Sequence, residues 1–300
     1  MSNYRILIAG GGTGGHLFPA LAIGEEIHRR EPEAKIHYVG STFGMEARVF
    51  PVKDVWHTLL PIRGFQRGIS FQSIGRNFLL PVRIIRSWLK MNSLIQDFVP
   101  QVVVGTGGYA AALPLYLASK RDKPLPIILQ EQNSIPGITT RWFAEKAETI
   151  CVAFNEAKDA INSETILTGN PVRKDITEGH REDGIKEYNF DEKSKTLFLF
   201  GGSQGSAYLN KMMDQVASNI AGAGLQILWQ TGDLEYVKYK HRDSSNIRVV
   251  PFIHNMADSY AMADLIICRS GALTLAEITV CGKPSILVPF PAAAADHQTK

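Results

Sequence analysis

The stretch Ala9-Gly10-Gly11-Gly12-Thr13-Gly14-Gly15-His16 decides the fold. It follows an apolar segment, Ile6-Leu7-Ile8, that is typical of a buried strand, and it opens a segment with helical spacing that carries Pro19 in its first turn. Glycine lets the backbone come close to a ligand, and the helix N-terminus behind it offers N–H groups and partial positive charge. We therefore interpret the stretch as a ligand site between a strand and a helix in a doubly wound α/β fold.

The spacing Gly10-x-Gly12-x-x-Gly15 also matches the dinucleotide-binding fingerprint. That fingerprint requires an acidic residue at the end of the second strand to hold a ribose. Here the second strand, residues 35–39, continues into Gly40-Ser41-Thr42-Phe43. The loop is therefore not expected to bind NAD.

Length and composition indicate a globular protein with two domains, because 300 residues with 45% hydrophobic content can bury a large core. Cys151, Cys268 and Cys281 lie far apart without the spacing of a metal site, and Met1-Ser2-Asn3-Tyr4 does not resemble the start of a secretory signal. These features favour a reduced, cytoplasmic setting.

The net charge of +3 is small, but the basic residues are unevenly distributed. No acidic residue lies between Asp54 and Asp97, and apolar residues alternate there with Arg63, Arg67, Arg76, Arg83, Arg86 and Lys90. A helix over about 76–90 with this mixture suits an anionic membrane surface. A helix with its apolar face on the core and its basic face in water suits the pattern equally well. Nucleic-acid binding is not expected, because the charge is confined to one stretch without a recognition motif.

Strands and helices alternate along the chain, which predicts parallel sheets covered by helices. The expected strands of the first half are 5–9, 35–39, 101–104, 126–129 and 149–152. A second strand, 196–200, leads into Gly201-Gly202-Ser203-Gln204-Gly205-Ser206 and a helix, which repeats the pattern at the start of the chain. We therefore predict two Rossmann-like domains, residues 1–160 and 161–300, that face each other across a cleft.

The chain stops at Lys300, soon after a last expected strand at 285–288. A doubly wound domain normally continues with a helix after such a strand. We therefore expect the second domain to be truncated and to lack its final helices, and we expect a chain of this length to be inactive.

The best candidate for nucleotide binding in the second half is the segment 269–277. The N–H groups of Ala272, Leu273 and Thr274 could hold a diphosphate at a helix start, and Glu277 could accept hydrogen bonds from ribose hydroxyls. An ordinary capped helix with a buried acid would have the same sequence features.

His16 is the candidate general base in the first half, because a histidine that titrates near neutrality can take a proton from a sugar hydroxyl. It is equally compatible with a role as an orienting group or a cap. The segments 105–109 and 130–133 are expected to line the same cleft, although they could simply be turn glycines and polar loop residues. The sequence has no Asp-x-Asp pair or Walker lysine, so we expect no metal and no cofactor, with the leaving diphosphate stabilised by helix dipoles and Arg173.

Several motifs occur together in one order, and as a set they resemble the MurG family of bacterial transferases, which convert lipid I to lipid II in peptidoglycan synthesis. The motifs are Gly-Gly-Thr-Gly-Gly-His at 11–16, Gly-Gly-Tyr at 107–109, Glu-Gln-Asn at 131–133, Gly-Asn-Pro-Val-Arg at 169–173, Gly-Gly-Ser-Gln-Gly at 201–205, and Arg-Ser-Gly-Ala-Leu-Thr at 269–274 with Glu277. One departure is Gln130, where many members of the family have His.

The resemblance implies a GT-B fold and a metal-independent, inverting transfer of N-acetylglucosamine from UDP-GlcNAc to the C4 hydroxyl of lipid I. It implies that His16 is the base and that 76–90 docks on the cytoplasmic face of the cell membrane, as in a peripheral protein. Residues implied to reach the sugar or the acceptor are Thr13, Gly14, Gly15 and Asn133. Residues implied to hold UDP-GlcNAc are Arg173, Ser203, Ile253, Ala272, Leu273, Thr274, Leu275, Ala276, Glu277 and Gln298.

Three alternatives fit parts of the pattern. A diacylglycerol glucosyltransferase would share the basic face and the nucleotide site. A UDP-sugar epimerase of the same fold would need acids for elimination chemistry and no membrane face, and the stretch 63–90 argues against it. A non-catalytic sensor of nucleotide sugars would keep the fold without needing His16. The choice among them rests on the motifs together and not on the fold.

Overall fold

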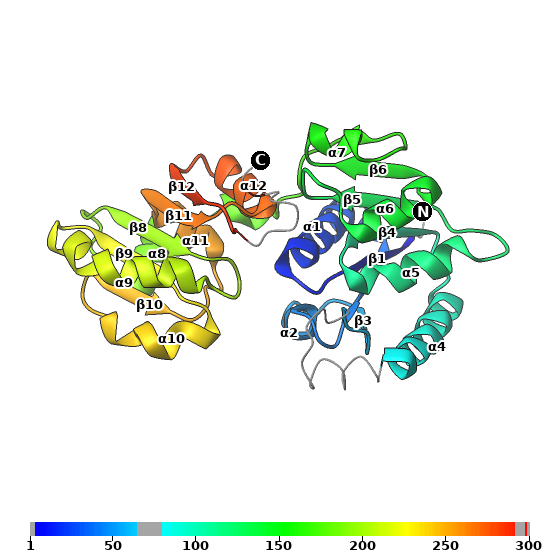
Figure 1. Cartoon of the computed structure of the whole chain (residues 1–300), viewed down its shortest axis with the longest axis horizontal. Helices are drawn as coiled ribbons and strands as arrows, with labels where there is room; N and C mark the ends of the chain where they lie inside the picture. Colours follow the sequence, from blue (N-terminus) through cyan, green and yellow to red (C-terminus); the bar gives the residue numbers. More distant parts are fainter. Residues whose placement is uncertain (1–3, 65–79, 292–297, 299–300) are drawn as a thin grey trace. The chain divides into compact units, whose positions relative to one another are not determined.

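The computed structural model describes residues 4–64, 80–291 and 298. The chain divides into two compact units, residues 1–173 and 174–300, and each unit has a parallel sheet of its own (Figure 1).

The sheet of the first unit has seven strands in the order β3-β2-β1-β4-β5-β6-β7, and every neighbouring pair is parallel. Its strands are β1 (Arg5–Gly10), β2 (Lys35–Ser41), β3 (His57–Leu60), β4 (Val102–Gly107), β5 (Ile127–Glu131), β6 (Thr149–Val152) and β7 (Ile166–Leu167). Its helices are α1 (Gly14–Arg30), α2 (Glu46–Val52), α4 (Leu80–Phe98), α5 (Tyr109–Ser119), α6 (Ile138–Phe143) and α7 (Asn155–Asp159), with a 3-10 turn at Ala144–Lys146.

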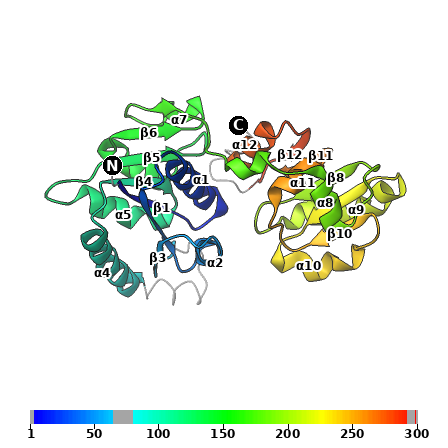
Figure 2. The same ribbon diagram turned by 180° about the vertical axis from the view of Figure 1, so that it is seen from behind.

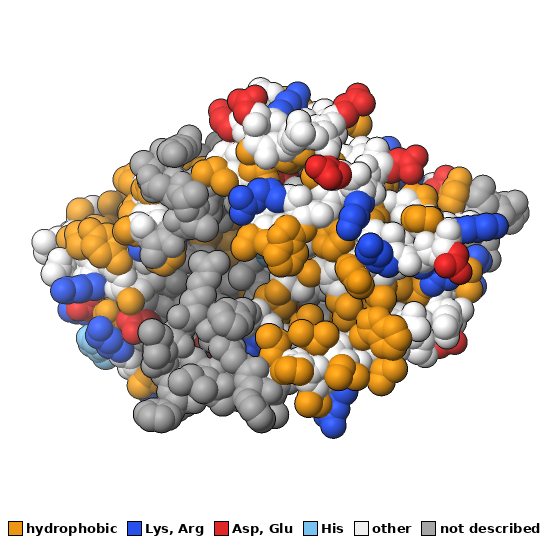
Figure 3. Space-filling view, turned by 45° about the vertical axis from the view of Figure 1, so that its right-hand side comes forward, with side chains coloured by type: hydrophobic (Ala, Val, Ile, Leu, Met, Phe, Trp, Pro, Cys, Tyr) orange, Lys and Arg blue, Asp and Glu red, His pale blue; other side chains and the backbone are white. Residues whose placement is uncertain are grey.

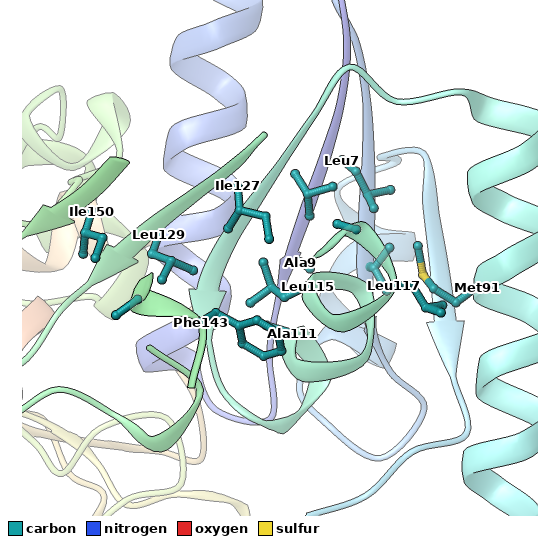
Figure 4. Close-up of a cluster of buried hydrophobic side chains, with 14 of the residues drawn as sticks. Leu7, Ala9, Met91, Ala111, Leu115, Leu117, Ile127, Leu129, Phe143 and Ile150 are labelled. Atoms are coloured by element: carbon teal, nitrogen blue, oxygen red, sulfur yellow. The ribbon is translucent and has the colours of Figure 1, made fainter. Parts of the chain in front are cut away.

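Both faces of this sheet are buried, which explains why the strands are nearly continuous apolar runs. Side chains alternate along β1, so that Ile6 and Ile8 pack on the side of α1 while Leu7 and Ala9 pack on the side of α5. Figure 4 shows the second of these clusters, in which Leu115 of α5 and Met91 of α4 lie with residues of the central strands. The sheet therefore holds its loops on a rigid, packed base.

The sheet of the second unit has five parallel strands in the order β10-β9-β8-β11-β12 (Figure 2). Its strands are β8 (Thr196–Phe200), β9 (Gln226–Gln230), β10 (Ile247–Val250), β11 (Leu265–Arg269) and β12 (Ser285–Val288). Its helices are α8 (Arg181–Tyr188), α9 (Ala207–Gly222), α10 (Asp233–Tyr239), α11 (Met256–Met262) and α12 (Ala272–Val280), with 3-10 turns at Lys174–Thr177 and Lys240–Arg242.

The alternation of strands and helices in the sequence predicted this architecture, and the strands expected at 149–152, 196–200 and 285–288 are found at these positions. Five short elements, β3, α2, α7, α8 and α10, were not predicted. The helix α8 lies within the polar, charged stretch 174–195. Glu182, Asp183, Lys186 and Glu187 are exposed, while Gly184, Ile185 and Tyr188 are buried, so three of its eight residues are in the core.

The helix expected over 76–90 is found from Leu80 onward as α4, and the expectation for 76–79 lies outside the described residues. Within the part of the chain that the structure describes, no helix combines the length and the hydropathy needed to cross a bilayer.

Candidate active site

Each sheet has one point at which the order of its strands reverses. In the first unit this point lies between β1 and β4, and in the second between β8 and β11. Ligands of doubly wound folds bind beyond the carboxyl ends of the strands at such a point. The first point is bordered by Gly10 and Gly107, and the second by Phe200 and Arg269, so each lies at a loop that the sequence analysis selected.

A buried carboxylate fills the inside of the first glycine-rich loop. Glu46, the first residue of α2, is fully buried, and its two carboxylate oxygens each lie 3.0 Å from the backbone nitrogen of Gly12. One of them also accepts from the N–H of Ser41 at 2.8 Å. An N–H group that a phosphate would use is therefore taken by the protein itself, and a negative charge already stands behind it. This contact explains physically why a loop with a dinucleotide-like spacing is poorly suited to a dinucleotide.

Sequence reasoning missed Glu46 because the acid does not stand at the end of β2. It comes five residues after Ser41, on a short helix that was not predicted. The glycines around it give a signal that could have been used. A side chain at Gly11 or Gly44 would place its Cβ 2.3 Å from the Glu46 carboxylate, so both positions need glycine to enclose that group.

His16 lies in the first turn of α1, half-buried, with its ring held from one side. Its Nδ1 lies 3.0 Å from the carbonyl oxygen of Thr106 and 2.9 Å from Oε1 of Gln132. The hydroxyl of Thr106 donates in turn to the carbonyl oxygen of His16 at 2.7 Å. Among the described residues, no group hydrogen-bonds to the other ring nitrogen, Nε2. The arrangement suits a base whose Nε2 meets a substrate hydroxyl.

The glycines after β4 let this ring approach the backbone. Gly107 and Gly108 have φ values of +94° and +77°, which favour glycine. A Cβ at Gly107 would lie 2.9 Å from His16 Nδ1, and one at Gly108 would lie 3.0 Å from His16 Cδ2. The glycines of the motif at 107–109 therefore form a turn and also leave the space that the His16 ring occupies.

Tyr109 closes the same loop from the other side. A Cβ at Gly12 would lie 2.6 Å from its ring, and its hydroxyl donates to Ser41 Oγ at 3.4 Å. Burial raises the pKa of Tyr109 above its ordinary value, so the phenol stays neutral. Tyr109 belongs to the motif at 107–109, but it was not predicted to be a site residue.

The segment 130–133 was expected to line a cleft, and the structure turns most of it inward. Glu131 is buried, and its carboxylate accepts from the N–H of Gly137 at 2.9 Å and from the Thr140 hydroxyl at 2.6 Å. Its other oxygen accepts from the backbone and side-chain nitrogens of Asn133, at 3.1 and 3.3 Å. The Glu131 carboxylate therefore holds the loop after β5 in place and orients Asn133.

Other predicted residues of the first unit gather at the start of α1. Thr13 is the exposed N-cap residue of α1, and Gly14 and Gly15 form its first turn. The guanidinium of Arg173 lies 5.3 Å from the centroid of the Phe18 ring, one turn further along α1. Arg173 thus belongs to the first unit, although it was expected to hold the nucleotide sugar.

Arg269 ties together the strand ends at the switch point of the second unit. Its Nε and Nη2 donate to Ser206 Oγ at 3.2 and 2.9 Å, and its Nη1 donates to the carbonyl oxygen of Pro289 at 2.7 Å. Ser206 is also the N-cap of α9, where it accepts from the N–H of Leu209. Burial lowers the pKa of Arg269 from its ordinary value, yet the guanidinium stays charged at neutral pH because that value is so high.

The predicted nucleotide-binding residues of the second unit follow the strands β8, β10, β11 and β12 along the chain. Ser203 lies in the turn after β8, whose shape is fixed by a hydrogen bond from Gln230 to the carbonyl of Gly202. The segment 272–277 forms the first turns of α12. Ile253 is buried in the segment after β10, and Gln298 Oε1 accepts from the N–H of Phe290 at 2.9 Å.

Glu277 lies on α12 and accepts from the hydroxyl of the buried Tyr260 at 2.8 Å. Burial and the negative charge of Glu277 raise the pKa of Tyr260 well above its ordinary value, so the phenol keeps its proton and remains the donor. The contact links Glu277 of α12 to Tyr260 of α11. The contact predicted between Glu277 and the ribose stays a prediction.

Comparison with known proteins finds matches in both units of the chain. Residues 6–152 match the N-terminal domain of glycosyltransferase family 28, and residues 196–300 match its C-terminal domain. The chain belongs to glycosyltransferase family 28. One relative in this family, from Christiangramia forsetii, is 38% identical over 99% of this chain and 80% of its own length. Its name is UDP-N-acetylglucosamine–N-acetylmuramyl-(pentapeptide) pyrophosphoryl-undecaprenol N-acetylglucosamine transferase.

Similarity to solved structures shows that this chain has the GT-B fold, as the resemblance implied. The crystal structure of Acinetobacter baumannii MurG superposes with a TM-score of 0.67 at 27% identity, covering 99% of this chain and 82% of that one. A putative UDP-N-acetylglucosamine 2-epimerase from Listeria monocytogenes also superposes, with a TM-score of 0.63 at 12% identity, covering 96% and 79%. That second likeness shows the fold alone, so the fold does not distinguish a transferase from an epimerase.

Proposed function

We propose that this protein transfers N-acetylglucosamine from UDP-GlcNAc to the C4 hydroxyl of the muramyl sugar in lipid I, with inversion at the anomeric carbon, to give lipid II. The observation that carries the proposal is similarity over nearly the whole chain to relatives named for this transfer. The hydrogen bonds of His16 Nδ1 in the first unit support the proposed role of His16 as the base.

In this proposal His16 takes the proton of the acceptor hydroxyl at Nε2. Nδ1 is already engaged with Thr106 and Gln132, so Nε2 is the nitrogen left for the substrate. As the hydroxyl loses its proton, its oxygen forms a bond to the anomeric carbon, and the bond from that carbon to the diphosphate breaks. UDP leaves with the electron pair, and the proton stays on the imidazole.

The acceptor sugar, rather than its diphosphate, is proposed to lie against the first glycine-rich loop. Glu46 places a negative charge inside this loop and takes the N–H of Gly12, and both effects disfavour a phosphate. An uncharged sugar tolerates this environment and can use the hydroxyl of the exposed Thr13 and the amide of Asn133.

The donor is proposed to bind at the switch point of the second unit. The first turn of α12 supplies N–H groups and the positive end of a helix dipole for the diphosphate, and Glu277 accepts from the ribose. Ser203, Ile253 and Gln298 complete the proposed nucleotide site. Charge on the leaving diphosphate is proposed to be stabilised by the helix and by Arg173, without a metal ion.

The outer face of α4 is proposed to dock on the cytoplasmic face of the cell membrane, as a peripheral contact. In its first half, α4 exposes apolar side chains that the core does not use: Val82, Ile84, Ile85, Trp88 and Leu89. Arg86 and Lys90 are exposed beside them, and hydrophobic side chains gather on this face in Figure 3. An amphipathic helix with its apolar residues in the core would show the opposite pattern, so the exposure favours the membrane interpretation.

The test is transfer of labelled N-acetylglucosamine from UDP-GlcNAc to a lipid I analogue by the chain extended beyond Lys300, with diacylglycerol as a competing acceptor. We expect label on the lipid I analogue and none on diacylglycerol. Transfer to diacylglycerol alone would instead support the glucosyltransferase alternative, and conversion of UDP-GlcNAc to another UDP-sugar without an acceptor would support an epimerase.

A further inference from the structure

Gln132 lies behind the His16 ring, on the side away from Nε2. It is 2% exposed, and it immediately follows the end of β5. The sequence motif at 131–133 contains it, yet neither the motif nor the proposed reaction gives it a role. Its side-chain nitrogen lies within hydrogen-bonding distance of three oxygens and its side-chain oxygen of His16 Nδ1, so both ends of this buried amide have partners.

The surroundings fix which end of this amide faces the histidine. The nitrogen, Nε2 of Gln132, lies 2.8 Å from the carbonyl oxygen of Thr106 and 3.0 Å from that of Gln130, and it also meets the side-chain oxygen of Gln130. All three are acceptors, so the donor end of the amide must point at them. The acceptor end, Oε1, is therefore the atom that lies 2.9 Å from His16 Nδ1.

The two neighbours of His16 Nδ1 are then both oxygens that can only accept, namely Gln132 Oε1 and the carbonyl of Thr106. A nitrogen between two acceptors must carry the proton. The neutral imidazole is thus held in the form with hydrogen on Nδ1 and a lone pair on Nε2. This is the tautomer that a base acting through Nε2 requires.

We propose that Gln132 is a positioning residue that, together with the Thr106 carbonyl, holds His16 in the Nδ1–H tautomer with its Nε2 lone pair directed to the acceptor hydroxyl. The proposal rests on the proposed function for its kinetic consequence, while the tautomer itself can be observed without turnover. The neighbouring carboxylate does not perform this task, because Glu131 is bound to Gly137, Thr140 and Asn133. The group behind the base is therefore an uncharged amide.

The test compares three variants. Gln132→Met keeps the length of the side chain but removes the acceptor. Gln132→Glu keeps an oxygen that can face Nδ1, and in its protonated form its hydroxyl can donate to the acceptors that Gln132 Nε2 meets. Gln226→Met is the matched control, because Gln226 is also a buried amide but lies in the second unit, where it bonds to the backbone of Asp191.

Loss of one hydrogen bond of about 1 kcal/mol predicts that Gln132→Met lowers kcat about five- to tenfold. The KM for UDP-GlcNAc should change less than about twofold, because the donor is held elsewhere. Gln132→Glu should retain more of kcat than Gln132→Met, and Gln226→Met should leave kcat unchanged. Equal losses of kcat in Gln132→Met and Gln226→Met would contradict a role specific to His16.

Nitrogen-15 spectra of the imidazole rings provide the readout that a purely structural role would not move. With His16 assigned by comparison with a His16→Gln variant, the wild-type ring should show Nδ1–H and an unprotonated Nε2, and Gln132→Met should increase the Nε2–H form. A wild-type ring with hydrogen on Nε2 would overturn the proposal even if neither Gln132 variant folds. A wild-type Nδ1–H ring in a protein that transfers no sugar would support this assignment and contradict the proposed function.

Discussion

The carboxylate of Glu46 and the backbone nitrogen of Gly12 are joined at 3.0 Å, inside a loop whose sequence resembles a phosphate cradle. The contact changes what the loop can bind. Residues 9–16 keep the close backbone approach that glycine permits, yet they present an internal anion where a dinucleotide would place its phosphates.

Replacing this anion should loosen the loop. We expect Glu46→Gln to destabilise the first unit by about 1–3 kcal/mol, because the new amide N–H₂ would face the N–H donor of Gly12 even when the amide oxygen keeps the bond to Ser41. Transfer should fall about tenfold or more, since the loop leads directly into His16. Urea unfolding and the transfer assay measure the two effects. Glu33→Gln, at an exposed glutamate, is the control, and equal behaviour of the two variants would argue against the structural role of Glu46.

In the second unit, the geometry of Arg269 should matter as well as its charge. A lysine in its place cannot bond Ser206 and Pro289 together, because it lacks the planar fork of donors. We expect Arg269→Lys to weaken UDP binding about fivefold or more in calorimetry. Arg242→Lys is the control, because Arg242 pairs with Asp214 on α9, and this change should leave UDP binding as it is. Unchanged binding in Arg269→Lys would separate this residue from the donor site.

The membrane proposal predicts that acidic residues on α4 abolish docking. The double variant Ile85→Glu/Trp88→Glu should reduce binding to vesicles that contain anionic lipid by about tenfold or more, since it places charge where apolar surface would enter the interface. The control is Leu234→Glu/Val237→Glu on α10, where Leu234 is 92% exposed. Sedimentation with vesicles measures both, and equal binding by the wild-type protein and the α4 variant would contradict the proposal.

Elements with a strong local pattern could be predicted from the sequence, and the contacts that make the site could not. The apolar runs of β1 and β8 and the glycines after them determined the architecture, because their pattern depends on neighbours in the chain. Glu46 contacts Gly12 from a position 34 residues away, and His16 meets Gln132 across 116 residues, so neither contact leaves a local signal. Glu131 is the opposite case, because it lies in a motif that stands out in the sequence, yet its carboxylate makes hydrogen bonds that hold its own loop together.

A buried histidine should make the first unit sensitive to acid. His37 packs against Trp56 and Phe98, and its Nδ1 has no hydrogen-bond partner within the described part of the chain. Burial, with a smaller effect from the charge of His57, lowers the pKa of His37 to about 4 from its usual 6.5. Because the folded state resists protonation and the unfolded state does not, stability should be lost as the pH falls from about 6.5 towards 4.

The loss attributable to His37 should approach about 3 kcal/mol at the acid end of this window. His37→Phe keeps the ring contacts and should flatten the pH dependence, whereas His180→Gln, at an exposed histidine, should not. Urea unfolding at a series of pH values measures this dependence. The same steep dependence in His37→Phe and in the wild-type protein would rule out His37 as its source.

The central claim is that His16 acts on the acceptor while the second unit binds the donor. The most direct measurement is kcat for transfer of N-acetylglucosamine to a lipid I analogue by His16→Ala, together with the Kd of UDP-GlcNAc for the same variant. The account predicts a fall in kcat of about a hundredfold or more, as expected for loss of a general base, with the Kd of the donor nearly unchanged. Transfer by His16→Ala at close to the wild-type rate would contradict it.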